Sequence, residues 1–238
     1  MKKHIPNVIT LCNLACGLYG LVLIQKGDIV MASIMIGPAL IFDFLDGFMA
    51  RILKVSSHIG KELDSLADMV TFGVLPGFIM FALITQSACD PNVCTGLLGS
   101  SYFPFIAAAI PLMSAMRLAK FNVDARQSDL FIGLPTPANS IFIASLPLIA
   151  LYQPHWFEHI AHPKILGGLT FIMSYLLVAE IPLLALKFKT FAVKGNGFRY
   201  TLILGSVLFL VFFKWIGLPI VILYYILLSI INNVVNKS

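Results

Sequence analysis

The stretch DFLDGFMARILKVSSHIGKELDSLADMVTFG, residues 43–73, places four aspartates inside an otherwise apolar chain. Burying a charged side chain within a bilayer is costly, so an acid there indicates a functional role. Residues three, four or seven apart share one face of an α-helix. By this spacing Asp43 and Asp46 share a face of one helix, and Asp64 and Asp68 share a face of the next. A polar break between the two pairs predicts a turn that lets the faces meet.

The composition predicts an integral membrane protein. Of 238 residues, 59% are hydrophobic and 11% charged, and the mean hydropathy is +0.93, outside the range of soluble globular domains. Apolar stretches long enough to cross roughly 30 Å of hydrocarbon recur, and none alternates with the period of two that a membrane β-barrel needs. We predict an all-α, polytopic transmembrane helical bundle of eight spans, at about 6–25, 29–53, 58–86, 101–121, 137–153, 164–187, 199–213 and 216–234.

The chain shows no linker, charge block or low-complexity segment that would divide it. We therefore expect one integral membrane domain over residues 1–238, with a catalytic core at about 1–190 and additional C-terminal spans at about 199–234. The polar segment between the third and fourth spans holds Cys89 and Cys94, which could form a disulfide in an oxidising compartment or stay reduced.

The basic residues predict the orientation, because cytoplasmic loops collect Lys and Arg. With the N terminus inside, only Lys26, Lys164 and Lys214 fall on the outer side. The net charge of +5 is then a topology signal, and we expect no nucleic-acid partner. The predicted location is the inner, cytoplasmic membrane, with the N terminus and the aspartates on the cytoplasmic side.

The four facing carboxylates would repel one another, and Arg51 alone cannot neutralise them. Hard oxygen ligands suit a divalent metal, here a pair of ions. The alternative is that the acids are ion-pair partners of Arg51, Lys54 and Lys61 at a membrane boundary. Two metals are a standard clamp for displacement at phosphorus, which predicts phosphoryl-transfer chemistry. Gly47 and Gly60 would leave room for a bulky group, and Ser56 or Ser57 could cap the third helix.

The spacing D-x2-D-G-x2-A-R-x8-G-x3-D-x3-D resembles the signature of the CDP-alcohol phosphotransferases. Its fixed positions are filled by Asp43, Asp46, Gly47, Ala50, Arg51, Gly60, Asp64 and Asp68. The segment from Pro6 to Thr10, with Asn13 and Gly17, is similar to the first helix of that family. Residues 117–122 and 131–139 resemble the bacterial and archaeal branch that forms phosphatidylserine.

The resemblance implies CDP-diacylglycerol and L-serine as substrates, phosphatidylserine and CMP as products, and two Mg²⁺ or Mn²⁺ ions. It implies that the four aspartates are metal ligands and that Asp68 is also the base for the acceptor hydroxyl. Nucleotide and pyrophosphate contacts are implied for Gly47, Arg51 and Ser57, and cytidine contacts for Asn7 and Thr10. Dimers are usual in families with this fold, so a homodimer is also an expectation.

Serine carries a carboxylate and an ammonium group, so its pocket should offer a cation and acceptors. Arg117 and Lys120, one turn apart, suit the carboxylate, although both could be ordinary positive-inside residues. Asn122 could add a polar contact, and Asn139 could face the pocket or bond a neighbouring helix. Glu180 is a separate acid within the predicted span 164–187, with no assigned role.

Two alternatives stay open from the sequence. The same chemistry could use another acceptor, such as glycerol 3-phosphate, inositol phosphate or choline. A phosphorylated acceptor would favour more cations than Arg117 and Lys120, and Arg126 could join them. A cation or proton transporter would instead spread its acids along a path through the membrane, whereas here four aspartates cluster within residues 43–68.

Overall fold

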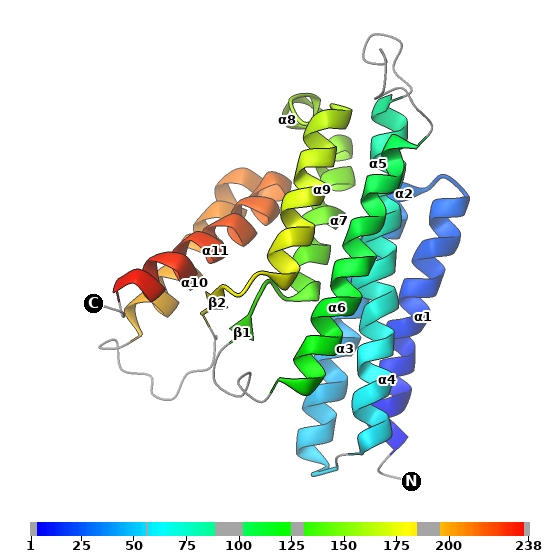
Figure 1. The fold of residues 1–238 in the computed structure, drawn as a ribbon, viewed down its shortest axis with the longest axis vertical. Helices are drawn as coiled ribbons and strands as arrows, with labels where there is room; N and C mark the ends of the chain where they lie inside the picture. The colour runs from blue at the N-terminus through cyan, green and yellow to red at the C-terminus, as the bar shows by residue number, and fades with distance from the viewer. Residues whose placement is uncertain (1–3, 56, 89–101, 125–130, 185–195, 236–238) are drawn as a thin grey trace.

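The computed structural model describes residues 4–55, 57–88, 102–124, 131–184 and 196–235. Figure 1 shows a bundle of long helices running roughly side by side, which confirms the predicted helical membrane architecture. In these ranges five helical stretches of at least 18 residues are apolar enough to cross a membrane: Ile5–Gln25, Ile29–Ile52, His58–Ala88, Phe103–Val123 and Gly197–Val235. The apolar helices Thr136–Tyr152 and Pro163–Val178 are shorter. The exact number of spans stays a prediction, and Cys89 and Cys94 lie outside the described residues.

The first half of the bundle holds α1 (Ile5–Gln25), α2 (Ile29–Ile34), α3 (Ile36–Ile52) and α4 (His58–Asp68). The π-helix η2 (Met69–Val74) joins α4 to α5 (Leu75–Ala88), and the 3-10 turn η4 (Phe103–Ala108) leads into α6 (Ala109–Val123). The rest is α7 (Thr136–Tyr152), α8 (Pro154–Glu158), α9 (Pro163–Val178), α10 (Gly197–Phe213), the 3-10 turn η6 (Lys214–Ile216) and α11 (Gly217–Val235). Pro137 lies in the first turn of α7, where its missing N–H costs nothing.

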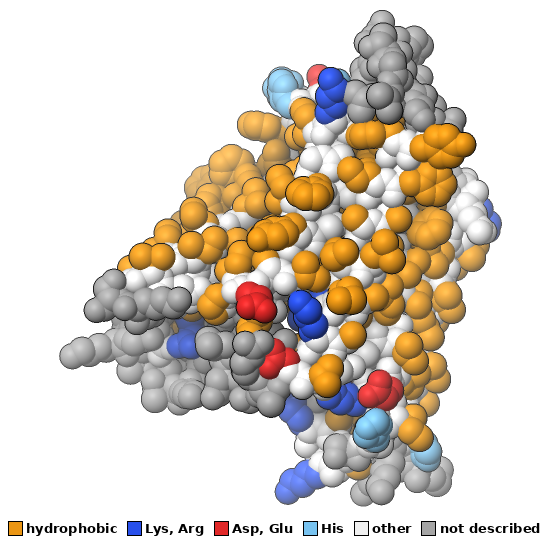
Figure 2. Space-filling model, viewed as in Figure 1, with side chains coloured by type: hydrophobic (Ala, Val, Ile, Leu, Met, Phe, Trp, Pro, Cys, Tyr) orange, Lys and Arg blue, Asp and Glu red, His pale blue; other side chains and the backbone are white. Residues whose placement is uncertain are grey.

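The core lies where α1, η2, α5 and α7 pack together. Phe72, Leu75, Ile79 and Ile143 are fully buried there. Outward-facing apolar side chains cover much of the surface in Figure 2, while the charged side chains on that face lie mainly toward its ends and lower half. An apolar belt between polar ends is the surface that a bilayer requires.

The last two helices form a hairpin that leans away from the bundle in Figure 1 and packs on it through α11 and α7. Gln153, just after α7, holds the tip of this hairpin. Its Nε2 donates to the carbonyl of Phe213 (3.2 Å), and its Oε1 accepts from the N–H of Ile216 (3.0 Å). The hairpin is therefore attached to the bundle at a defined position.

The sixth predicted span, 164–187, was wrong at its C-terminal end, because α9 stops at Val178. Proline has no N–H to bond the carbonyl four residues earlier, and it disfavours helical backbone in the residue before it. Pro182 therefore prevents α9 from continuing past Val178. Ala179 is already extended, and Pro182–Leu183 (β2) pairs antiparallel with Phe131–Ile132 (β1). Glu180 consequently lies on an extended segment outside the helix.

Gly133 fixes this two-stranded pair in place. Its φ of +77° is a left-handed conformation that other residues rarely adopt, and its N–H donates to the carbonyl of Ile181 (3.0 Å). A Cβ at this position would come within 2.7 Å of the carbonyl oxygen of Leu177 and 3.1 Å of that of Ala179. Backbone atoms cannot move aside as side chains can, so the position requires glycine.

We expect Gly133→Val to displace the segment that carries Glu180. Left-handed strain and backbone overlap should together cost about 2–4 kcal/mol. Thermal unfolding in detergent should show a lower Tm than wild type, and Gly168→Val should serve as the control, because no atom lies within 4 Å of a Cβ at Gly168. Equal Tm values for the two variants would contradict the role given to Gly133.

Candidate active site

Three of the four aspartates meet between α3 and α4. Asp43, Asp64 and Asp68 each offer a carboxylate oxygen, and these atoms lie within 4.8 Å of one another. The Oδ1 atom of Asp64 is buried and has no hydrogen-bond partner among the described residues. Without a cation, close carboxylates repel one another and the unpaired buried oxygen costs free energy. A bound cation removes the repulsion and gives that oxygen a partner. The donor set therefore fits a divalent metal.

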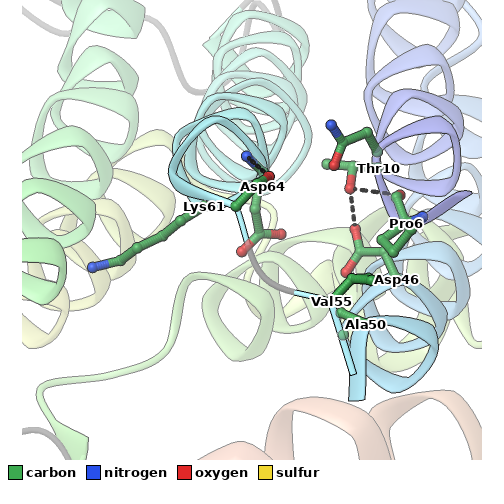
Figure 3. Close-up of a pocket in the computed structure, with 11 residues that line it drawn as sticks. Pro6, Thr10, Asp46, Ala50, Val55, Lys61 and Asp64 are labelled. Atoms are coloured by element: carbon green, nitrogen blue, oxygen red, sulfur yellow. Dashed lines mark hydrogen bonds between the residues drawn. The ribbon is translucent and has the colours of Figure 1, made fainter. Parts of the chain in front are cut away.

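Asp46 is not one of these three acids and has a hydrogen-bond partner on α1. Asp46 is 6% exposed, and its Oδ2 accepts a hydrogen bond of 2.6 Å from the hydroxyl of Thr10 on α1. Figure 3 shows the two side chains pointing toward one another beside the cavity. Asp46 stays a predicted metal ligand, and in this geometry its carboxylate links α3 to α1.

The nearby cations make other bonds. Arg51 donates its Nε to the carbonyl of Gly47 in its own helix (3.0 Å). Lys61 donates its Nζ to the carbonyl of Asn122 (3.1 Å) and extends away from Asp46 and Asp64 in Figure 3. These contacts favour the metal interpretation over the alternative in which Arg51 and Lys61 neutralise the acids.

A cavity of about 270 Å³ opens between α1, α3 and α4. It contains four of the five residues predicted to contact the nucleotide donor, whereas Arg51 is not part of its wall. The lining residues are Pro6, Asn7, Thr10, Asp46, Gly47, Ala50, Val55, Ser57, Gly60, Lys61 and Asp64. The cavity thus joins predicted donor contacts to the acids that would hold a metal.

The two glycines of the cavity have different roles. A Cβ at Gly47 would meet no atom within 4 Å, so this glycine keeps the cavity open. A Cβ at Gly60 would come within 2.9 Å of Ser57 Oγ and 3.1 Å of Asn7 Oδ1, so this glycine allows close packing. The Ser57 hydroxyl accepts the N–H of Gly60 (2.9 Å) and caps α4, which confirms the predicted cap.

Asn13 is a site residue to which the sequence analysis gave no role. It is fully buried on α1, and its Nδ2 donates to Asp68 Oδ1 (3.2 Å). The hydroxyl of Thr71 in the π-helix donates to the backbone carbonyl of Asn13 (3.2 Å). The sequence pattern could have identified Asn13, because Thr10 and Asn13 are polar residues three positions apart on an apolar helix and so share a face. Asn13 orients one oxygen of Asp68 and leaves the other available.

Replacing Asn13 by Ala should lower kcat about 10- to 100-fold with little change in the KM for the nucleotide donor, because the Asp68 carboxylate loses its orienting hydrogen bond. Steady-state kinetics would measure both constants. Leu11→Ala, an exposed change on the same helix, should leave both unchanged. An effect on KM alone would contradict a positioning role for Asn13.

The predicted acceptor residues are divided between three places. Arg117 and Lys120 line a second cavity at the end of α6. Asn122 instead donates its Nδ2 to Ser65 Oγ on α4 (2.9 Å), and neither polar atom of the buried Asn139 side chain has a partner in the described part of the chain. The structure thus brings Arg117 and Lys120 together and places Asn122 and Asn139 elsewhere.

A protein-family model described as CDP-alcohol phosphatidyltransferase matches residues 3–228. The chain belongs to this family. One relative is the CDP-diacylglycerol–serine O-phosphatidyltransferase of Bacillus subtilis, 31% identical over 75% of this chain and 89% of the relative. The protein of the same name from Helicobacter pylori strain J99 is 30% identical over 74% of this chain and 70% of its own length. Archaetidylserine synthase of Methanothermobacter thermautotrophicus is 31% identical over 63% of this chain and 60% of that protein.

This CDP-alcohol phosphatidyltransferase therefore carries a candidate metal centre and an adjoining cavity in the part of the chain that the family model matches. The family match also extends over α10 and most of α11. The multi-pass membrane character follows from the apolar helices that hold the site.

Proposed function

We propose that this protein transfers the phosphatidyl group of CDP-diacylglycerol to the hydroxyl of L-serine, forming phosphatidylserine and CMP. The observation that carries the proposal is the convergence of Asp43, Asp64 and Asp68 beside a cavity between helices in the membrane. The names of the B. subtilis and H. pylori relatives support serine as the acceptor. The archaeal relative, named for a different lipid, also carries serine in its name.

Asp43, Asp64 and Asp68 would hold the metal, and we propose a pair of Mg²⁺ or Mn²⁺ ions with Asp46 as the fourth ligand. When bound, such ions neutralise a pyrophosphate and stabilise the charge that develops on the attacking and leaving oxygens. Asn7, Thr10, Gly47 and Ser57 line the donor cavity. We assign that cavity to the nucleotide part of the donor, with Arg51 near its edge.

Asp68 is the proposed base. As the serine oxygen forms its bond to phosphorus, the bond between that phosphorus and the CMP oxygen breaks, and the hydroxyl proton passes to the Asp68 carboxylate. Asn13 donates to Asp68 Oδ1 and would hold the carboxylate in a fixed orientation for this transfer. A hydroxyl is a weak nucleophile at neutral pH, and a positioned carboxylate makes it stronger by taking its proton as the bond to phosphorus forms.

The setting of the reaction is part of the proposal. The end of α3 and the start of α4 lie at the same end of the bundle as the N terminus in Figure 1, and the excess of basic residues supports a cytoplasmic position for that end in the inner membrane. We propose that residues 1–238 form one membrane domain and that the protein works as a homodimer. Membrane lipid would surround the apolar helices and supply the donor.

The test uses purified protein in detergent or lipid with CDP-diacylglycerol, labelled L-serine and Mg²⁺ or Mn²⁺. We expect CMP release together with labelled lipid, and neither product in the presence of a chelator. No CMP release with serine or any other acceptor would overturn the enzymatic proposal. CMP release with glycerol 3-phosphate, inositol phosphate or choline but not with serine would support phosphatidyl transfer and overturn serine as the acceptor.

A further inference from the structure

The second cavity carries charges of both signs on different elements. It has a volume of about 300 Å³ and lies between the end of α6, β1 and the segment after α9. Its walls are formed by Arg117, Lys120, Val123, Asp124, Ile132, Leu177, Val178, Ala179 and Glu180. The two cations are on α6 and Asp124 directly follows that helix, whereas Glu180 lines the cavity from the extended segment. Acidic and basic side chains also lie close together in the lower half of the face in Figure 2.

We infer that Glu180 determines acceptor specificity by binding the ammonium group of the amino-acid acceptor. This inference rests on the proposed function. A free amino acid is a zwitterion whose two charged groups are attached to one carbon atom, so it fits a pocket that presents a cation and an anion from different elements. A phosphorylated acceptor has only negative charge near its phosphate and would be repelled by Glu180.

Arg117 supplies the cation for the carboxylate. Its side chain is held on two sides, because the guanidinium lies 5.2 Å from the ring centre of Phe121 and donates to Thr136 Oγ1 at 3.4 Å. A planar guanidinium held this way can bind a carboxylate through two parallel hydrogen bonds. Lys120 is exposed on the same helix and also lines the cavity.

The same arginine connects the cavity to the reacting groups. Arg117 is buried and interacts electrostatically with Asp68. Arg117 is therefore shared between the wall of the second cavity and the surroundings of Asp68. Serine can keep its charged end between Arg117 and Glu180 while its hydroxymethyl group points toward the proposed base.

The position of Glu180 depends on the break in α9. Had that helix continued to residue 187, Glu180 would lie on a membrane-spanning helix. Instead Pro182 ends the helix, and the N–H groups of Gly133 and Leu134 bond the carbonyls of Ile181 (3.0 Å) and Leu176 (2.8 Å). These bonds hold the backbone on both sides of Glu180. The end of α9 thus places an acid in the wall of the cavity that Arg117 and Lys120 also line.

The test compares L-serine with 3-hydroxypropionate, which keeps the hydroxyl and the carboxylate but lacks the ammonium group. In Glu180→Gln we expect the KM for serine to rise about tenfold or more, as for loss of a charge-assisted hydrogen bond. The KM for CDP-diacylglycerol should not change. The inhibition constant of 3-hydroxypropionate against serine should stay the same or fall, and Glu180→Asp should recover part of the serine affinity.

Glu158→Gln is the matched control, because Glu158 is an exposed acid that does not line the cavity, and its helix α8 lies at the other end of the bundle from β1 in Figure 1. A serine KM in Glu180→Gln within twofold of wild type would overturn the inference. So would a parallel rise in the serine KM and the 3-hydroxypropionate inhibition constant, because that pattern indicates a damaged pocket. Failure of the wild-type protein to use serine would instead overturn the proposed function itself.

Discussion

Replacing Asp68 by Asn should abolish phosphatidyl transfer while the donor still binds. Removal of a general base alone lowers rates by about 10²- to 10⁴-fold, and Asp68 is in addition one of the three acids that converge on the candidate metal site. The amide is nearly isosteric with the carboxylate but cannot accept the hydroxyl proton. Single-turnover CMP release would measure the chemical step, and equilibrium binding of CDP-diacylglycerol would measure what remains of the donor site.

Asp28→Asn is the control for this experiment, because it makes the same chemical change at the N-cap of α2. Asparagine caps a helix about as well as aspartate, so rate and binding should match wild type. If Asp68→Asn lost donor binding as completely as turnover, the metal role of Asp68 would dominate. Turnover within tenfold of wild type would remove Asp68 from the proposed chemistry.

Much of this site could be predicted from the sequence because helical spacing is local information. Asp64 and Asp68 are four residues apart, which separates them by about 40° around a helix axis, so they stay on one face. Asp43 and Asp46 are three apart, or about 60°. That wider angle lets Asp43 join the cluster while Asp46 turns to Thr10 on α1. The spacing predicts the shared face, whereas the contact between Asp46 and Thr10 depends on how α1 packs against α3.

The sequence was less informative where distant backbone atoms decide the structure. The C-terminal end of α9 depends on Pro182 and on pairing with β1 about 50 residues earlier. An apolar segment that continues to Leu186 hides this end from a hydropathy analysis. The role of Asn13 was also hidden in the sequence, because it depends on a contact with Asp68, a residue 55 positions away. In both cases the missing information was a long-range contact.

Asp64→Asn should stabilise the metal-free protein and inactivate it. Three carboxylates with oxygens within 4.8 Å repel one another, and the buried Oδ1 of Asp64 lacks a hydrogen-bond partner among the described residues. A neutral amide removes one charge from the cluster. A gain of roughly 1 kcal/mol would raise Tm by about 2–4 °C in a chain of this size, measured by thermal unfolding in the presence of a chelator.

The same variant should respond weakly to metal. Mn²⁺ or Mg²⁺ should raise the Tm of the wild-type protein, since a ligand that binds only the folded state stabilises it, and should raise that of Asp64→Asn much less. Glu158→Gln, an exposed acid on α8, should keep the wild-type response. A metal-free Asp64→Asn protein less stable than wild type would mean that the carboxylates stabilise the fold without a cation. Repulsion within the cluster predicts the opposite, because acids placed together to bind a metal cost stability until the metal is present.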